Sequence, residues 1–219
     1  MIRYLKKLFS MAVAISVCCG AFAKGITVSI GAGTNWKEKR EPQVAVWLED
    51  ADGNYIRTLY VTSRAEKRSW IFSPKDGRPE SLPVWYCASG ENPAKNSGKK
   101  SFGDGKAALD AVSSATPKGG VIFGAEIDGE KSYVIKVELN NSFDYNGFYT
   151  KKNSGVNGQP SVVYGALIPD GFTQEIRLEL LGTGSVDGSD GIIHPETENL
   201  TTAKNIISCI AVVPSAEGE

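Results

Sequence analysis

The sequence predicts an all-β fold: an immunoglobulin-like β-sandwich of two sheets with one short helix and long loops. Short runs of alternating apolar and polar residues recur along the chain, each bounded by turn-forming residues. The 219 residues, 41% of them hydrophobic, suffice to bury the core of one domain. No internal repeat, coiled coil or apolar run of membrane-spanning length interrupts this pattern. Together these observations favour a sandwich.

The N-terminus has the pattern of a signal peptide. Basic residues precede a short apolar stretch over 8–17, and Ala21-Phe22-Ala23 supplies the small-x-small cleavage pattern. We therefore expect residues 1–23 to be removed and 24–219 to form one periplasmic or extracellular domain. Cys18 and Cys19 raise a lipoprotein alternative, which is less favoured because Val17 stands where a small residue is wanted.

The first half of the mature chain begins with three expected strands. Residues 25–30 alternate as a half-buried strand does, and 43–48 and 55–62 flank an Asp-Gly-Asn turn. Shorter strands are expected over 70–72 and 82–86, and Pro83 moves the second toward an edge or a bulge.

A loop and one helix are expected before the second group of strands. Residues 88–106 are rich in Gly, Ser, Asn and Lys, which indicates a long loop. Residues 106–112 form the expected helix, with Asp104 as N-cap. The Gly/Ser/Asp-rich segment 182–191 predicts a flexible loop. The remaining apolar runs predict strands over 120–127, 132–139, 160–168, 174–181 and 206–213.

Two cysteines, Cys87 and Cys209, remain after cleavage. In an oxidising compartment a disulfide between them would close a long loop and stabilise the fold by a few kcal/mol in the chain-entropy model. The alternative is two free thiols, and sequence alone leaves both open.

Charge and composition argue against several classes of function. The mature chain is mildly acidic, which disfavours non-specific nucleic-acid binding. Its single histidine, His194, excludes a three-histidine zinc site, and no Gly-x-Ser-x-Gly motif is present. The loop acids lack the spacing of an EF-hand and are expected to be solvated: Asp187, Asp190, Glu196 and Glu198. We expect a protein that is not an enzyme and holds no metal.

One segment carries specific chemistry. Asp110-Ala-Val-Ser-Ser-Ala-Thr116, followed by Pro117, resembles the acceptor motif at which flavin transferases attach FMN to threonine. Ser113, Ser114 and Ala115 would give the Thr116 hydroxyl clearance in another enzyme's active site. Asp110 would position the segment or help to hold the transferase's metal. The alternative is a Ser/Thr-rich turn before a proline.

The motif belongs to a set of blocks in fixed order. These blocks are 44–62, Arg78-Pro-Glu-Ser-Leu-Pro-Val-Trp85, 110–120 and 158–164. The set resembles the predicted periplasmic proteins grouped as domain of unknown function 2271. This resemblance implies an exported β-sandwich that works with a flavin transferase and a membrane-bound redox partner. Ser114 departs from the glycine that related acceptor motifs most often carry.

The second block offers two further cofactor-binding candidates. The Arg78 guanidinium could pair with the FMN phosphate, and the Trp85 indole could stack on the isoalloxazine ring. The alternative is that Trp85 belongs to the core and that Arg78 pairs with Glu80 or Asp76.

Two functions follow from these observations. The first is an exported electron carrier with FMN joined to Thr116. The second is an unmodified β-sandwich that binds a partner through its long loops, 88–106 and 182–199.

Overall fold

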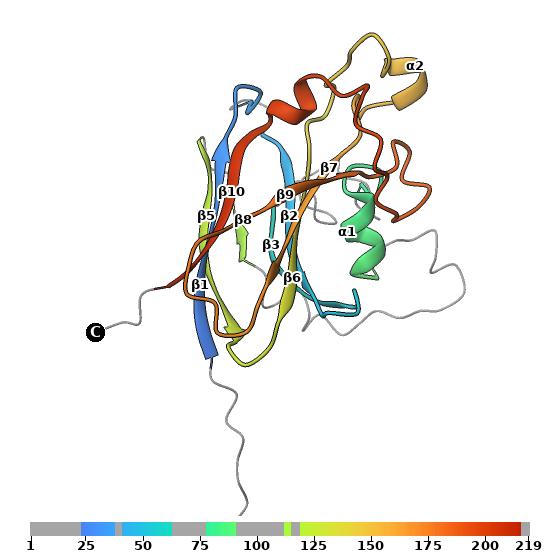
Figure 1. Cartoon of the computed structure of the whole chain (residues 1–219). Helices are drawn as coiled ribbons and strands as arrows, with labels where there is room; N and C mark the ends of the chain where they lie inside the picture. The colour runs from blue at the N-terminus through green and yellow to red at the C-terminus, as the bar shows by residue number, and fades with distance from the viewer. Residues whose placement is uncertain (1–22, 38–40, 63–77, 91–111, 115–118, 216–219) are drawn as a thin grey trace, which may run out of the picture.

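The fold is a sandwich of two β-sheets, which confirms the predicted all-β class (Figure 1). The computed structural model describes residues 23–37, 41–62, 78–90, 112–114 and 119–215. One sheet has the strand order β5-β1-β10-β8 and the other has the order β4-β3-β2-β6-β7-β9.

The first sheet contains β1 (Ala23–Ala32), β5 (Gly120–Asp128), β8 (Ile176–Arg177) and β10 (Ile207–Pro214). The second contains β2 (Gln43–Glu49), β3 (Tyr55–Thr62), β4 (Val112–Ser114), β6 (Tyr133–Asn140), β7 (Val162–Ile168) and β9 (Glu179–Thr183). The described helical segments are α1 (Pro83–Ala88), α2 (Lys151–Ser154) and the 3₁₀ turn η1 (Thr202–Asn205).

The main core lies between the two sheets and follows the two-residue period of the strands. Ile26, Val28 and Ile30 point inward from β1, and alternate residues of β2 and β6 meet them from the other sheet. Pairing within each sheet is antiparallel, except that β4 runs parallel to β3. The alternation read from residues 25–30 therefore identified the buried face of β1.

The six-stranded sheet is also covered on its outer face. Every residue of β2 is buried, because Ala45 and Trp47 point away from the main core into a second apolar cluster beneath α1. That cluster also contains Leu82, Val84 and Trp85. Figure 1 shows α1 against the outside of this sheet. The sandwich thus has a third, partial layer.

The strand predicted over 82–86 is wrong. This segment is helix α1, with Pro83 in its first turn. Proline fits the first turn of a helix because the N–H that it lacks would have no partner within the helix. The segment packs on the outer face of the six-stranded sheet and does not form an edge strand of it.

The other element predictions differ in smaller ways. The expected strand over 174–181 is divided into β8 and β9, which belong to different sheets and flank the buried Leu178. Val112, expected at the end of a helix, begins strand β4. The strand expected over 70–72 and the rest of the expected helix, 106–111, lie outside the described residues.

Of the two alternatives left open for the cysteines, the structure shows the one without a disulfide between Cys87 and Cys209. Cys87 lies in α1 outside the six-stranded sheet, whereas Cys209 is an exposed residue of β10 in the four-stranded sheet. The body of the sandwich separates them. None of the helices in the described segments is long and apolar enough to cross a membrane.

Two isoleucines give a matched test of the core. Ile135 is fully buried between the sheets, whereas Ile122 is 75% exposed on β5. We expect Ile135→Ala to lower the free energy of unfolding by about 2–5 kcal/mol. Ile122→Ala should change it by no more than about 0.5 kcal/mol. Denaturant unfolding measures both, and equal losses for the two variants would contradict this packing.

Candidate functional site

The proposed acceptor motif is anchored in the fold by strand β4. The backbones of Ser113 and Ser114 belong to this strand, and their partners on β3 are Val61 and Thr62. The remaining predicted motif residues lie outside the described part of the chain: Asp110, Ala115 and Thr116.

The strand within the motif and the strand that follows it are both edge strands. β4 is the edge of the six-stranded sheet, and β5, which begins at Gly120, is an edge of the four-stranded sheet. Only residues 115–118 separate Ser114 from the described Gly119. Gly120 has φ +112°, and a Cβ there would lie 2.4 Å from the backbone oxygen of Ile30. The chain therefore passes from one sheet to the other at this side of the sandwich, with a glycine where a side chain would clash.

The motif strand and the Arg78–Trp85 block belong to the same sheet. Ser113 pairs with Val61, Val61 pairs with Ala45, and Ala45 pairs with Glu138, so the four form one row across the strands. Helix α1 lies over this row, because Val61 and Ala45 pack in its cluster. Two blocks that are separate in the sequence thus converge on one sheet.

Trp85 is a core residue. Its side chain is 6% exposed, and its indole Nε1 donates a hydrogen bond to Thr58 Oγ1 at 2.9 Å. The ring also meets Tyr86 edge-on, with centroids 4.8 Å apart. The indole is therefore fixed between α1 and β3, and the structure shows the core alternative for this residue.

Arg78 is held by three different neighbours. Its guanidinium pairs with Glu80 at 3.1 Å and donates hydrogen bonds to Ser142 Oγ and Asn157 Oδ1, both at 2.9 Å. The side chain is largely buried. Since Ser142 and Asn157 lie in the β6–β7 connection, Arg78 ties the start of the α1 segment to the end of the sheet. The structure thus shows the pairing with Glu80 that the sequence offered as the alternative to phosphate binding.

Sequence reasoning missed Glu138, which lies beneath α1. Its carboxylate accepts hydrogen bonds from the backbone N–H groups of Trp85 at 2.8 Å and Val84 at 3.3 Å, and from Ser161 Oγ at 2.6 Å. The residue is completely buried, and this burial raises its pKa to about 7. In the sequence Glu138 occupies the polar phase of β6, which normally indicates a solvent-facing residue. Glu138 is buried because α1 covers this face of the sheet, which the sequence pattern of β6 does not indicate.

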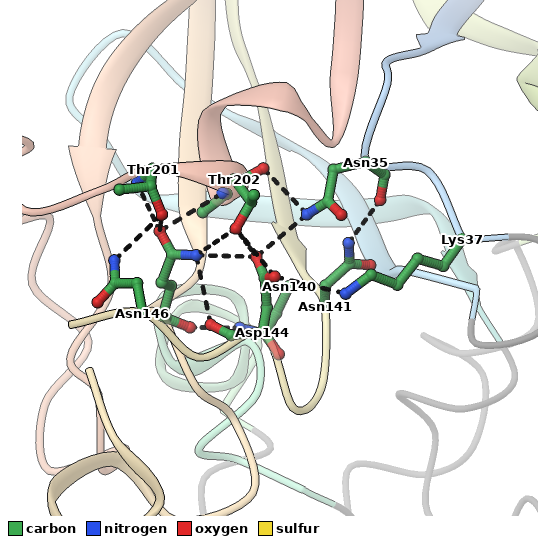
Figure 2. Close-up of polar contacts among 10 residues, drawn as sticks. Asn35, Lys37, Asn140, Asn141, Asp144, Asn146, Thr201 and Thr202 are labelled. Atoms are coloured by element: carbon green, nitrogen blue, oxygen red, sulfur yellow. Dashed lines mark hydrogen bonds and ion pairs between the residues drawn. The ribbon is translucent and has the colours of Figure 1, made fainter. Parts of the chain in front are cut away.

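A second polar cluster closes the end of the sandwich where β6 ends (Figure 2). Asp144 is its hub: the carboxylate accepts hydrogen bonds from Asn35 at 3.1 Å, Gln159 at 3.0 Å and Thr202 at 2.9 Å. Lys37 adds an ion pair at 3.4 Å. These residues come from three separate connections, so the cluster fixes the ends of β1, β6 and β10 relative to one another.

The segment 182–191, predicted to be a flexible loop, packs against α1 through Gly184 and Gly191. Gly191 lies so close to Cys87 that an added Cβ would be 2.1 Å from that residue's own Cβ. Ser185 and Asp190 exchange hydrogen bonds across the loop, and Asp190 Oδ1 lies 3.2 Å from His194 Nε2. Within the described segments, no three His, Cys, Asp or Glu side chains are grouped so that they could hold a metal.

Comparison with known proteins does not extend this description. No protein family, curated protein or solved structure matches the chain.

Glu138 predicts a specific dependence of stability on pH. Its pKa is about 7 in the folded protein against an ordinary 4.5. Between these two pH values the unfolded chain has released the proton that the folded protein keeps, so the free energy of unfolding falls as pH rises. The loss from this residue is about 3 kcal/mol and is complete above about pH 7.

The control is Glu138→Gln, which keeps one acceptor oxygen for the Trp85 N–H and cannot ionise. Urea titrations at a series of pH values should give a smaller decline for this variant than for the parent between pH 4.5 and 7. Parallel curves for the two proteins would contradict the account of Glu138.

Arg78 predicts a loss of stability that is unrelated to any ligand. Arg78→Met removes one partner from each of Glu80, Ser142 and Asn157, and we expect a cost of about 2–4 kcal/mol. Arg177 is the matched control, because it pairs with Glu175 on the exposed surface. Arg177→Met should change the free energy of unfolding by less than about 1 kcal/mol. A neutral Arg78→Met would show that the three contacts hold nothing in place.

Proposed function

We propose that this protein is an exported electron carrier with FMN joined to Thr116 by a phosphoester. The observation that carries the proposal is the Asp110–Thr116 motif, which contains the edge strand β4 and is followed in the chain by the edge strand β5. An edge position suits a segment that a separate flavin transferase must bind, because the outer side of β4 has no neighbouring strand in the described sheet.

The described residues fit a tether better than a binding pocket for the flavin. Trp85 and Arg78 are both committed to the fold, so neither is free to stack on the ring or pair with the phosphate. A cavity of about 250 Å³, lined by Arg57, Ile127 and Tyr133 among others, lies at the end of β3 away from its pairing with β4. It is smaller than typical ligand sites, which are about 300–1,000 Å³. Covalent attachment retains the cofactor without a pocket.

The attachment that we propose is a substitution at phosphorus. The Thr116 hydroxyl attacks the FMN phosphorus of FAD, a new P–O bond forms, and the pyrophosphate bond breaks with AMP as the leaving group. A base of the transferase takes the hydroxyl proton. Once attached, the flavin supplies the electron transfer, and this chain supplies its location and accessibility.

Export and partners belong to the same proposal. Removal of the signal peptide after Ala23 would leave β1 intact from Lys24 onward. The flavin transferase would act on the exported chain, and a membrane-bound redox partner would deliver or receive the electrons. A covalent bond would prevent loss of the cofactor by diffusion outside the cytoplasm.

Mass measurement tests the proposal. The exported protein, co-expressed with a flavin transferase, should gain the mass of one FMN less one water. Thr116→Ala should abolish the gain, because no other hydroxyl occupies the acceptor position, whereas Thr173→Ala, on the exposed β7–β8 connection, should keep it. An unmodified parent, under conditions that modify an established acceptor protein, would overturn the proposal in favour of an unmodified interaction protein.

A further inference from the structure

The connection between β6 and β7 presents exposed apolar side chains at one end of the molecule. Phe143 is 46% exposed, Phe148 is 55% exposed and Val156 is 42% exposed. We call residues 142–157 the tip; Figure 1 shows it, with α2, projecting from the end of the sandwich. Apolar side chains scattered singly on a surface need no explanation, but a group on one projecting connection does.

Backbone and side-chain hydrogen bonds hold the tip in one shape. The Phe143 N–H donates to the Val156 carbonyl at 2.8 Å, and the Tyr145 hydroxyl donates to the Gly155 carbonyl at 2.7 Å. Asn153 fixes the start of α2 through the Thr150 N–H, at 2.6 Å, and the Phe148 carbonyl, at 2.8 Å. The aromatic side chains are therefore presented by a preorganised backbone.

Phe143 is held outward at a cost in backbone strain. Its φ of +61° makes it a non-glycine residue in the left-handed region, an arrangement disfavoured by roughly 1–2 kcal/mol. The buried hydrogen-bond network of the adjacent Asp144 maintains this conformation. A glycine or asparagine would satisfy the backbone more easily. An exposed phenylalanine at a strained position indicates a use for the ring itself.

The charges of the tip are positive at its surface. Lys151 and Lys152 are exposed, and the tip's one acidic residue, Asp144, is buried and paired with Lys37. Burial and the neighbouring Glu198, from the segment before η1, raise the pKa of the Tyr149 hydroxyl, so an acid from another segment also lies beside the tip. Exposed aromatic rings beside exposed lysines are the combination that enters the headgroup region of an anionic bilayer.

We propose that the tip docks the protein on the surface of a membrane that contains anionic phospholipid. Phe143, Phe148 and Val156 would enter the boundary between headgroups and acyl chains, while Lys151 and Lys152 contact the lipid phosphates. The tip projects, whereas small ligands are bound in concave sites, so an extended surface suits it better. Docking through the tip does not require the flavin, and it is tested separately from FMN attachment at Thr116.

Co-sedimentation with vesicles tests the proposal. The exported protein should bind vesicles of mixed phosphatidylcholine and phosphatidylglycerol and bind vesicles of phosphatidylcholine alone far more weakly. Each lysine near an anionic surface contributes about 1 kcal/mol, so the double variant Lys151→Ala/Lys152→Ala should bind roughly 30-fold more weakly. The matched controls are Lys131→Ala, at the opposite end of β6, and Ile122→Ala, on β5; both should bind as the parent does.

Phe143→Gly separates docking from folding. Removing the strained side chain should leave the free energy of unfolding unchanged or higher, yet weaken vesicle binding at least several-fold. Absence of binding by the parent, equal binding to both kinds of vesicle, or parental binding by the Phe143→Gly and double-lysine variants would each overturn the proposal. Binding to soluble glycans in place of vesicles would overturn it as well.

Discussion

The outer layer of this protein depends on a buried carboxylate beneath a short helix. Glu138 accepts two backbone N–H groups at the start of α1, which holds the helix against the six-stranded sheet. With α1 in place, Trp85 and Leu82 cover Ala45 and Trp47, and β2 becomes a strand buried on both faces. Helices of six residues are marginal in isolation, so this tertiary contact, and the packing that it permits, are what make α1 stable.

The two most specific blocks of the sequence, Arg78–Trp85 and Asp110–Thr116, have different positions relative to this outer layer. The Arg78–Trp85 block builds the cover: Arg78 reaches the β6–β7 connection, and Trp85 reaches β3. The acceptor-like block contains β4, which pairs with β3 at the edge of the sheet, on the side away from β2. A rigid, fully paired sheet beside an edge strand is a suitable scaffold for a group that must stay accessible. In our account the fold supplies the scaffold, and the chemistry belongs to the short segment after β4.

Sequence reasoning succeeded where a local pattern determines structure. The alternation in β1 identified that strand and its inner face, because a sandwich core requires a two-residue period. Apolar runs bounded by turn-forming residues identified β2 and β6 as strands. Sequence reasoning failed where contacts between residues far apart in the sequence determine the structure. Pro83 suggested an edge strand, but proline is equally suited to the first turn of a helix, where the structure places it. Glu138 was missed because it occupies a polar position of β6, which normally faces solvent. The sequence left open whether Cys87 and Cys209 are bonded, because spacing along the chain carries no information on where in the fold each cysteine lies. For Arg78 and Trp85 the sequence offered either cofactor binding or a structural role. Only the hydrogen-bond partners seen in the fold distinguish the two.

We propose that the flavin is tethered at the edge of the sandwich and not enclosed by it. The most direct measurement is the fluorescence of the covalently bound flavin before and after unfolding in guanidinium chloride. A tethered, solvent-exposed isoalloxazine should fluoresce nearly as strongly in the folded protein as in the unfolded one. Strong quenching that is released only by unfolding would contradict the claim, because it would place the ring against aromatic side chains such as Trp85.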